Sequence, residues 1–138
     1  MTPQQQQTLI DSAIAARGNA YAPYSNFLVG AALLTDNGGV VAGANVENAS
    51  YGLTLCAERV AAGAAVAAGA RGIVAVAVAT EGGAAPCGAC RQFLNEFGSA
   101  MTVLCVDSAS GRVTREVLLS ELLPESFGPA ALGGTRRP

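Results

Sequence analysis

Histidine and lysine are both missing from this chain of 138 residues. Without histidine, cysteine thiolates are the only soft metal ligands that the sequence offers. Without lysine, all eight basic residues are arginines, and the net charge is −2. The one pair of adjacent basic residues is Arg136–Arg137. A protein that follows a nucleic-acid backbone needs a cationic stripe, so this composition argues against a nucleic-acid partner.

Long apolar runs are also missing, although 51% of the residues are hydrophobic and only 13% are charged. The longest candidate, residues 60–70, stops at Arg71, short of the roughly 18 residues that a membrane helix needs. The first residues lack the basic and apolar regions of a signal peptide, so we expect a cytoplasmic protein with no membrane segment. The large apolar fraction suggests that partner subunits cover part of the surface.

The order of apolar and turn-forming residues alternates helices with strands. Helices are expected over residues 4–17, 55–69, 86–97 and 120–123. Strands are expected over residues 27–35, 40–45, 73–80, 102–107 and 113–119, with a hairpin turn at 36–39. This order indicates one layered α/β domain with a mixed sheet. We expect the domain to span residues 1–127 and a flexible tail to follow over residues 128–138.

Three of the four cysteines form a zinc pattern with one glutamate. Cys56 lies two residues before Glu58, and Pro86 directly precedes Cys87, which Cys90 follows at a spacing of three. A structural zinc site normally has four protein ligands, whereas a catalytic site has three and leaves one position for water. The pattern therefore indicates one Zn²⁺ with an open position and a carboxylate beside it that carries protons.

Each of these residues also has a simpler interpretation. Four cysteines can form two disulfides, but the lack of an export signal and the close spacing of Cys87 and Cys90 make a metal site the better prediction. In the simpler interpretation, Glu58 does no more than complement the dipole of a helix N-terminus. Cys105 lies in an apolar run and is expected to be a buried free thiol. As a fourth ligand it would instead make the protein a non-catalytic zinc module.

The expected helices bring the three sulfur atoms together. Cys56 falls at the start of the second helix, and Cys87 and Cys90 share one face in the first turn of the third. Helix N-termini favour thiolates, but three thiolates around Zn²⁺ still leave one excess negative charge. We therefore expect Arg59 or Arg91 to donate a hydrogen bond to a ligand sulfur. The alternative is an ordinary solvated arginine on each helix.

Several segments of the chain resemble the cytidine deaminase family. They are PYSNFLVGAA at residues 23–32, NVENASYGLTLCAER at 45–59, PCGACRQ at 86–92 and the ending LLPESF at 122–127. The chain length and the three cysteines resemble the short-chain, homotetrameric branch of that family. The resemblance implies a three-layer α/β/α fold with a mixed sheet of about five strands.

The resemblance also implies a reaction and a set of roles. Enzymes of this type deaminate cytidine and deoxycytidine hydrolytically in pyrimidine salvage. Each subunit would hold one Zn²⁺ through Cys56, Cys87 and Cys90, and Glu58 would carry protons. The substrate-binding residues implied are Phe27 and the Ala57 backbone for the base, Asn45 and Glu47 for the ribose, Val46 between that pair, and Phe127, which would reach into a neighbouring subunit's pocket.

The residues themselves leave alternatives to these roles. Phe27 would fit a strand in the core, Asn45 and Glu47 would fit a polar strand end, and Phe127 would fit an anchor within its own subunit. A blasticidin-type aminonucleoside deaminase or an RNA-editing deaminase would use the same chemistry. The ribose-directed pair favours a small nucleoside, and the lack of a basic surface disfavours RNA.

Overall fold

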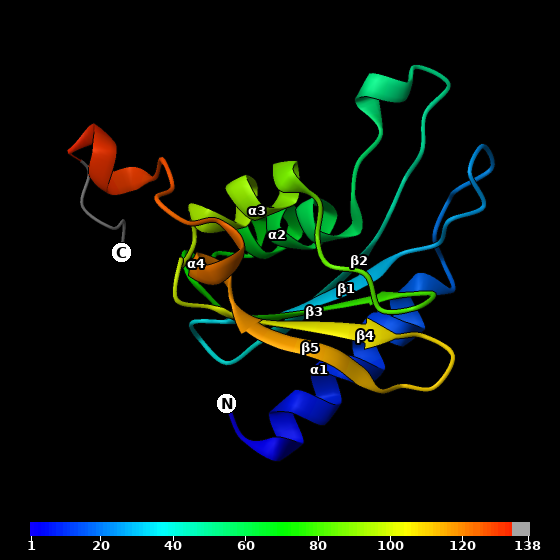
Figure 1. The fold of residues 1–138 in the computed structure, drawn as a ribbon, viewed down its shortest axis with the longest axis horizontal. Helices are drawn as coiled ribbons and strands as arrows, with labels where there is room; N and C mark the ends of the chain where they lie inside the picture. The colour runs from blue at the N-terminus through cyan, green and yellow to red at the C-terminus, as the bar shows by residue number, and fades with distance from the viewer. Residues whose placement is uncertain (134–138) are drawn as a thin grey trace.

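A mixed five-stranded sheet forms the centre of the fold in the computed structural model, which describes residues 1–133 (Figure 1). The strand order is β2-β1-β3-β4-β5. The strands are β1 (Gly30–Thr35), β2 (Val40–Ala44), β3 (Ile73–Thr80), β4 (Thr102–Asp107) and β5 (Val113–Leu118). The helices are α1 (Pro3–Arg17), α2 (Ala57–Ala67), α3 (Gly88–Asn95) and α4 (Leu119–Leu122), with two 3₁₀ turns, η1 (Tyr51–Leu53) and η2 (Pro129–Leu132).

The pairing of the strands explains why the sheet is mixed. The β3 and β4 strands are parallel, and α3 lies in the connection between them, as a parallel crossover requires. The other neighbours are antiparallel, and β1 and β2 form the expected hairpin. The interior strand β1 is buried along its whole length, whereas the edge strands β2 and β5 are partly exposed. The predicted mixed α/β fold is therefore confirmed.

Side chains that alternate along the strands divide the core between the two faces of the sheet. On β3, Val76 and Val78 belong to the cluster that packs with α2 and α3. The alternating alanines of β3, residues 75, 77 and 79, belong to the cluster that packs with α1, which contributes Leu9 and Ile10. Figure 1 shows α1 on one side of the sheet and α2 and α3 on the other. These are the three layers that were predicted.

Two glycines allow helices to approach the sheet closely, one on each face. A Cβ at Gly30 would lie 2.0 Å from the carbonyl oxygen of Ala13 in α1. A Cβ at Gly43 would lie 2.8 Å from the carbonyl oxygen of Ala57 and 2.6 Å from the backbone nitrogen of Ala61 in α2. Because both contacts are to backbone atoms, neither position accepts a side chain without moving a helix.

The structure shifts several predicted element boundaries by one to three residues, and three of these shifts bear on the site. The first strand begins at Gly30 rather than residue 27, because residues 22–29 form an irregular segment, here called the Phe27 loop. The second and third helices begin two residues later than expected, at Ala57 and Gly88. The residues before them, Cys56 and Cys87, have extended backbone angles and serve as N-caps.

The last described element is a short 3₁₀ turn in the C-terminal segment. Residues Pro129–Leu132 form η2, which projects from the body of the molecule in Figure 1. The rest of the expected flexible tail, residues 134–138, lies outside the described residues.

Across residues 1–133, the helices are all too short or too polar to cross a bilayer.

Candidate metal centre and active site

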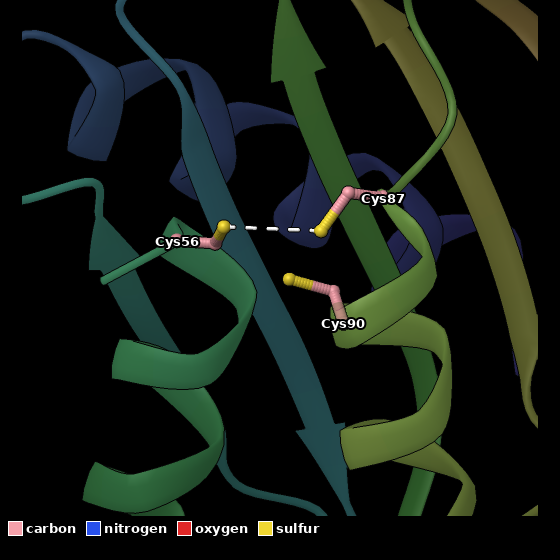
Figure 2. Close-up of side chains that lie close together, drawn as sticks. All are labelled: Cys56, Cys87 and Cys90. Atoms are coloured by element: carbon pink, nitrogen blue, oxygen red, sulfur yellow. Dashed lines mark hydrogen bonds between the residues drawn. The ribbon is translucent and has the colours of Figure 1, made fainter. Parts of the chain in front are cut away.

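Three cysteine side chains converge between the first turns of α2 and α3. Cys56 is the N-cap of α2, Cys87 is the N-cap of α3, and Cys90 lies in the first turn of α3. Figure 2 shows their sulfur atoms turned toward a common point. The three Sγ atoms all lie within 4.8 Å of one another. The spacing of the cysteines in the sequence and the two helix starts thus produce the cluster that was predicted.

The geometry of the cluster fits a tetrahedral Zn²⁺. Sulfur atoms that share such an ion at about 2.3 Å lie roughly 3.8 Å apart, and the Sγ atoms of Cys56 and Cys87 are 3.9 Å apart. A disulfide requires about 2.05 Å, and the cysteines are free thiols. Within residues 1–133, the ligand cluster contains these three sulfur atoms and Cys105 lies outside it. The donor set is therefore that of a zinc site with three protein ligands.

The charge balance of the cluster also favours a bound cation. The pKa of the Cys56 thiol is lowered by a hydrogen bond with Cys90 and by the neighbouring Arg59 guanidinium. The same hydrogen bond, together with burial, raises the pKa of Cys90. One thiolate in the cluster thus holds the proton on its neighbour. A divalent cation that replaces this proton allows all three sulfur atoms to act as thiolate ligands.

The two arginines expected near the sulfur atoms lie in different environments. The Nη2 group of Arg59 donates to the Sγ of Cys56 at 3.4 Å and to the carbonyl of Thr54. The Arg91 guanidinium instead donates to the backbone carbonyls of Pro86 and Leu122, at 2.8 and 2.9 Å. Arg91 thus ties the start of α3 to the C-terminal end of α4, and it does not donate to a ligand sulfur.

Glu58 lies in the first turn of α2, with its side chain buried in the pocket wall beside the cysteines. Only 3% of its surface is exposed. Burial raises the pKa of its carboxyl group, and the negative charge on Cys56 raises it further. A buried carboxyl with a raised pKa next to a metal centre is suited to accept a proton and to return it.

A pocket with a volume of about 200 Å³ opens beside the cluster. It combines four of the other predicted site residues with two of the cysteines. Its lining residues are Phe27, Val29, Asn45, Thr54, Cys56, Ala57, Glu58, Val78, Thr80, Ala84, Ala85 and Cys87. Ala57 lines it as well, at the backbone position expected to meet the base. The pocket is closed on one side by the Phe27 loop and on the other by residues that precede α3.

Asn45 and Glu47 are both hydrogen-bonded to the Phe27 loop. The Asn45 amide accepts from the Val29 N–H and donates to the Phe27 carbonyl, each at 2.9 Å. The Glu47 carboxylate accepts from the Ser25 hydroxyl and from backbone N–H groups of the loop, and these bonds lower its pKa. Glu47 lines a second cavity of about 380 Å³ that shares Thr54 with the first.

Two other expected substrate-binding residues lie outside the pocket of this chain. Val46 is 43% exposed, and its backbone is bonded to that of Leu55. Phe127 is 61% exposed and is tied to α3 by the Gln92 side chain, which donates to its carbonyl at 2.8 Å. The pocket of one chain is thus formed without Phe127.

Sequence reasoning missed the small residues that complete the pocket. Thr80 ends β3, and its hydroxyl accepts from the Ala84 N–H at 2.7 Å. Ala84 and Ala85 then form the wall between β3 and Cys87. Alanines and a threonine carry no chemical signal in a sequence, so only their place just ahead of the Pro86–Cys87 pair pointed to them. Cys105 is the predicted free, buried thiol.

Comparisons with known proteins agree with this site. The family described as the cytidine and deoxycytidylate deaminase zinc-binding region matches residues 3–106. The cytidine deaminase of Halalkalibacterium halodurans is 51% identical over 123 residues, which cover 88% of this chain and 92% of that protein. The cytidine deaminase of Mycobacterium tuberculosis is 44% identical over 128 residues, 91% of this chain and 92% of that protein.

A solved structure is also closely similar. The crystal structure of the cytidine deaminase from Burkholderia pseudomallei has a TM-score of 0.83 and 51% identity, and the match covers 92% of this chain and all of that one, 100%. The sequence, the fold and the cysteine cluster all support the same family. The chain belongs to the cytidine and deoxycytidylate deaminase family, as its motifs had indicated.

Proposed function

We propose that this chain catalyses the zinc-dependent hydrolytic deamination of cytidine and deoxycytidine, which gives uridine or deoxyuridine and ammonia. Family membership supports this activity. The observation that carries it is the convergence of three sulfur atoms and the buried Glu58 at one pocket. One Zn²⁺ per subunit would be held by Cys56, Cys87 and Cys90, which leaves one coordination position open.

Glu58 performs the proton transfers in this proposal. Zn²⁺ held by the three sulfur atoms would supply a position at which a water molecule loses its proton near neutral pH. The Glu58 carboxylate accepts that proton and delivers it to N3 of the cytosine ring, which makes C4 more electrophilic. The hydroxide left from that water adds to C4, which then bears both a hydroxyl and the amino group. Glu58 takes the proton of this hydroxyl and passes it to the amine, so that the C–N bond breaks, ammonia leaves and the C4 oxygen becomes a carbonyl. One carboxylate acts as base and then as acid.

The two adjoining cavities suit the two halves of a nucleoside. The cavity beside the cysteines is about 200 Å³ and is mainly apolar, which suits the base against Phe27 and the Ala57 backbone. The second cavity, about 380 Å³, is lined by Glu47 and suits the ribose. The Asn45 amide nitrogen has a second N–H beyond the one given to Phe27, so it can hold the loop and also donate to a ribose oxygen.

We further propose that four copies assemble into a homotetramer, in which Phe127 reaches a neighbour's pocket. The exposed aromatic rings support an association surface: Phe127 is 61% exposed, and Tyr51, in the 3₁₀ turn η1, is 73% exposed. Replacing Phe127 with Ala should raise KM several-fold in the assembled enzyme. The same KM in wild type and variant, with the oligomer intact, would make Phe127 an anchor within its own subunit.

Two broader expectations stay predictions. A single catalytic domain over residues 1–127 is supported by the core, which reaches Leu119. Family membership supports a role in pyrimidine salvage, and a cytoplasmic location is the second prediction.

A substrate panel combined with a zinc assay tests the proposed activity. The purified protein should contain one zinc per chain and should deaminate cytidine and deoxycytidine, measured by ultraviolet absorbance. Cytosine, blasticidin S and a cytidine-containing RNA serve as competing substrates on the same preparation. Turnover of blasticidin S or of the RNA alone would replace the proposed substrate class. Zinc without turnover of any of them would indicate a non-catalytic metal site.

A further inference from the structure

The Phe27 loop has neither helix nor strand, yet Phe27 and Val29 form one wall of the pocket. Side chains from outside the loop take the place of a strand partner. Glu47 holds the first half through backbone N–H groups, and Asn45 holds Phe27 and Val29 in the second half. The position of the Phe27 ring therefore depends on how well these few hydrogen bonds fix the backbone.

A further hydrogen bond reaches this loop from the opposite face of the sheet. The carbonyl of Leu28 accepts from the Nε group of Arg17 at 2.9 Å, in a partly buried position. Arg17 is the last residue of α1, whose core contacts lie on the face away from α2 and α3. A hydrogen bond from a charged donor is stronger than one between neutral groups. The adjacent carbonyls of Phe27 and Leu28 are thus held from two different elements.

The close approach of α1 to the sheet places Arg17 within reach. The strand that follows the loop begins at Gly30, and a Cβ there would lie 2.5 Å from the Arg17 nitrogen and 2.9 Å from its Cα. The last turn of α1 therefore rests directly on the backbone at the end of the loop. No residue of α1 is among the described residues that line the pocket, so Arg17 has access to the substrate only through the loop.

We propose that Arg17 is a positioning residue, which fixes the Leu28 carbonyl and thereby holds Phe27 against the nucleoside base. The inference rests on the proposed function for its kinetic consequence, but the structural part concerns the loop alone. Loss of the bond frees the backbone at Leu28, and the neighbouring Phe27 ring can then move away from the pocket wall. Because the ring contacts the substrate in both the ground and the transition state, the loss acts on KM more than on kcat.

The chain provides a matched control for this test. Arg71 also donates to backbone carbonyls, those of Val66 and Ala70 at 3.2 and 2.8 Å, but it lies between the C-terminal end of α2 and β3. Arg17→Met and Arg71→Met each remove one guanidinium that holds carbonyl groups. We expect Arg17→Met to raise KM about tenfold, as for one lost charged hydrogen bond, with kcat and zinc content near wild type. Arg71→Met should leave KM unchanged.

Hydrogen exchange gives a measurement that does not depend on activity. In Arg17→Met, amides in residues 22–29 should exchange faster, while those of β3 keep the wild-type rate. Arg17→Lys keeps the charge but displaces the donor, so it should raise KM by about threefold with the same exchange pattern. It also serves if the methionine variant does not fold. Wild-type KM together with wild-type exchange of the loop in Arg17→Lys or Arg17→Met would overturn the proposal.

A reference variant separates this inference from the proposed function. Phe27→Ala removes the ring itself and should raise KM at least as much as Arg17→Met. If Phe27→Ala leaves KM unchanged while Arg17→Met still speeds loop exchange, then the role of the ring in substrate binding is wrong and the positioning by Arg17 stands. If loop exchange is unchanged in Arg17→Met while Phe27→Ala raises KM, then the ring does bind the substrate and the positioning role of Arg17 is wrong.

Discussion

The helices on the two faces of the sheet have different N-caps. On one face, α1 begins with a complete capping box, in which Thr2 and Gln5 satisfy each other's backbone N–H groups. On the other face, α2 and α3 have Cys56 and Cys87 as N-caps, and neither side chain makes a capping hydrogen bond. An N-cap of the first kind stabilises a helix by about 1 kcal/mol. The helices α2 and α3 lack that stabilisation, because the side chains at their N-cap positions point into the sulfur cluster instead.

The two faces are alike in the way their helices meet the sheet. Gly30 lies under α1 and Gly43 under α2, each at a distance that excludes a Cβ. The contact at Gly43 is to Ala57 and Ala61, within one turn of Glu58. Close packing therefore positions the site as directly as hydrogen bonding does, and substitutions can test each face separately.

The largest expected effect is on the catalytic face, from Glu58→Gln. The amide has nearly the shape of the carboxyl group but cannot accept and return a proton, so turnover should fall by about 10²–10⁴-fold. Steady-state kinetics measure the loss, and zinc content and the melting temperature serve as controls that should not change. Turnover near the wild-type rate would remove Glu58 from the mechanism.

A pair of glycine variants compares the two faces directly. Gly43→Ala and Gly30→Ala should each cost roughly 1–3 kcal/mol of unfolding free energy, because a helix must move to admit the methyl group. Gly43→Ala should also lower kcat and zinc content, since it displaces the first turn of α2. Gly30→Ala should leave zinc content unchanged. Denaturation curves and metal analysis measure these effects, and equal zinc loss in both variants would contradict the comparison.

A smaller effect is expected from two buried neighbours in β4 that face opposite sides. Cys105 belongs to the core beside α2 and α3, and Val106 to the core beside α1. Cys105→Ala and Val106→Ala should each reduce stability by about 1–2 kcal/mol, with one zinc per chain retained in both. Zinc loss confined to Cys105→Ala would make Cys105 a metal ligand.

The smallest effect concerns the carboxylate of Asp107, the last residue of β4. The Ser110 hydroxyl and then the Gly82 N–H hold the pKa of Asp107 below its ordinary value of 3.8. Its stabilising contribution is therefore present above pH 3.8 and is lost as the pH falls through the lower folded pKa. The melting temperature of Asp107→Asn should lie slightly below wild type at pH 6, and the difference should narrow toward pH 3. A constant difference would exclude this linkage.

The sequence predicted those parts of the fold and site that depend on local spacing. Strand periodicity placed β3 and β4 with the bounds that the structure has. The Pro86–Cys87 pair, the spacing to Cys90 and the position of Cys56 predicted the sulfur cluster, because residues near helix starts have nearly fixed relative positions.

Parts that depend on contacts between distant segments were not predictable. Phe27 begins an apolar run in the sequence, yet it lies in a loop, where Asn45 donates to its carbonyl and the Ser25 hydroxyl accepts from its N–H. Arg59 and Arg91 each follow a cysteine closely in the sequence, but Arg59 donates to the Cys56 sulfur, whereas Arg91 donates to the carbonyls of Pro86 and Leu122. Neither fact can be derived from the local pattern.

The bare N-caps of α2 and α3 have a consequence for loss of the metal. A shared ion would act as a cross-link between positions 56 and 87, which are 31 residues apart, and would close that loop. Chelation would then leave both helix starts without either a cap or a tether, so fraying would begin at residues 57–60 and 88–91 while α1 stayed intact. Inactivation by metal starvation would thus precede global unfolding.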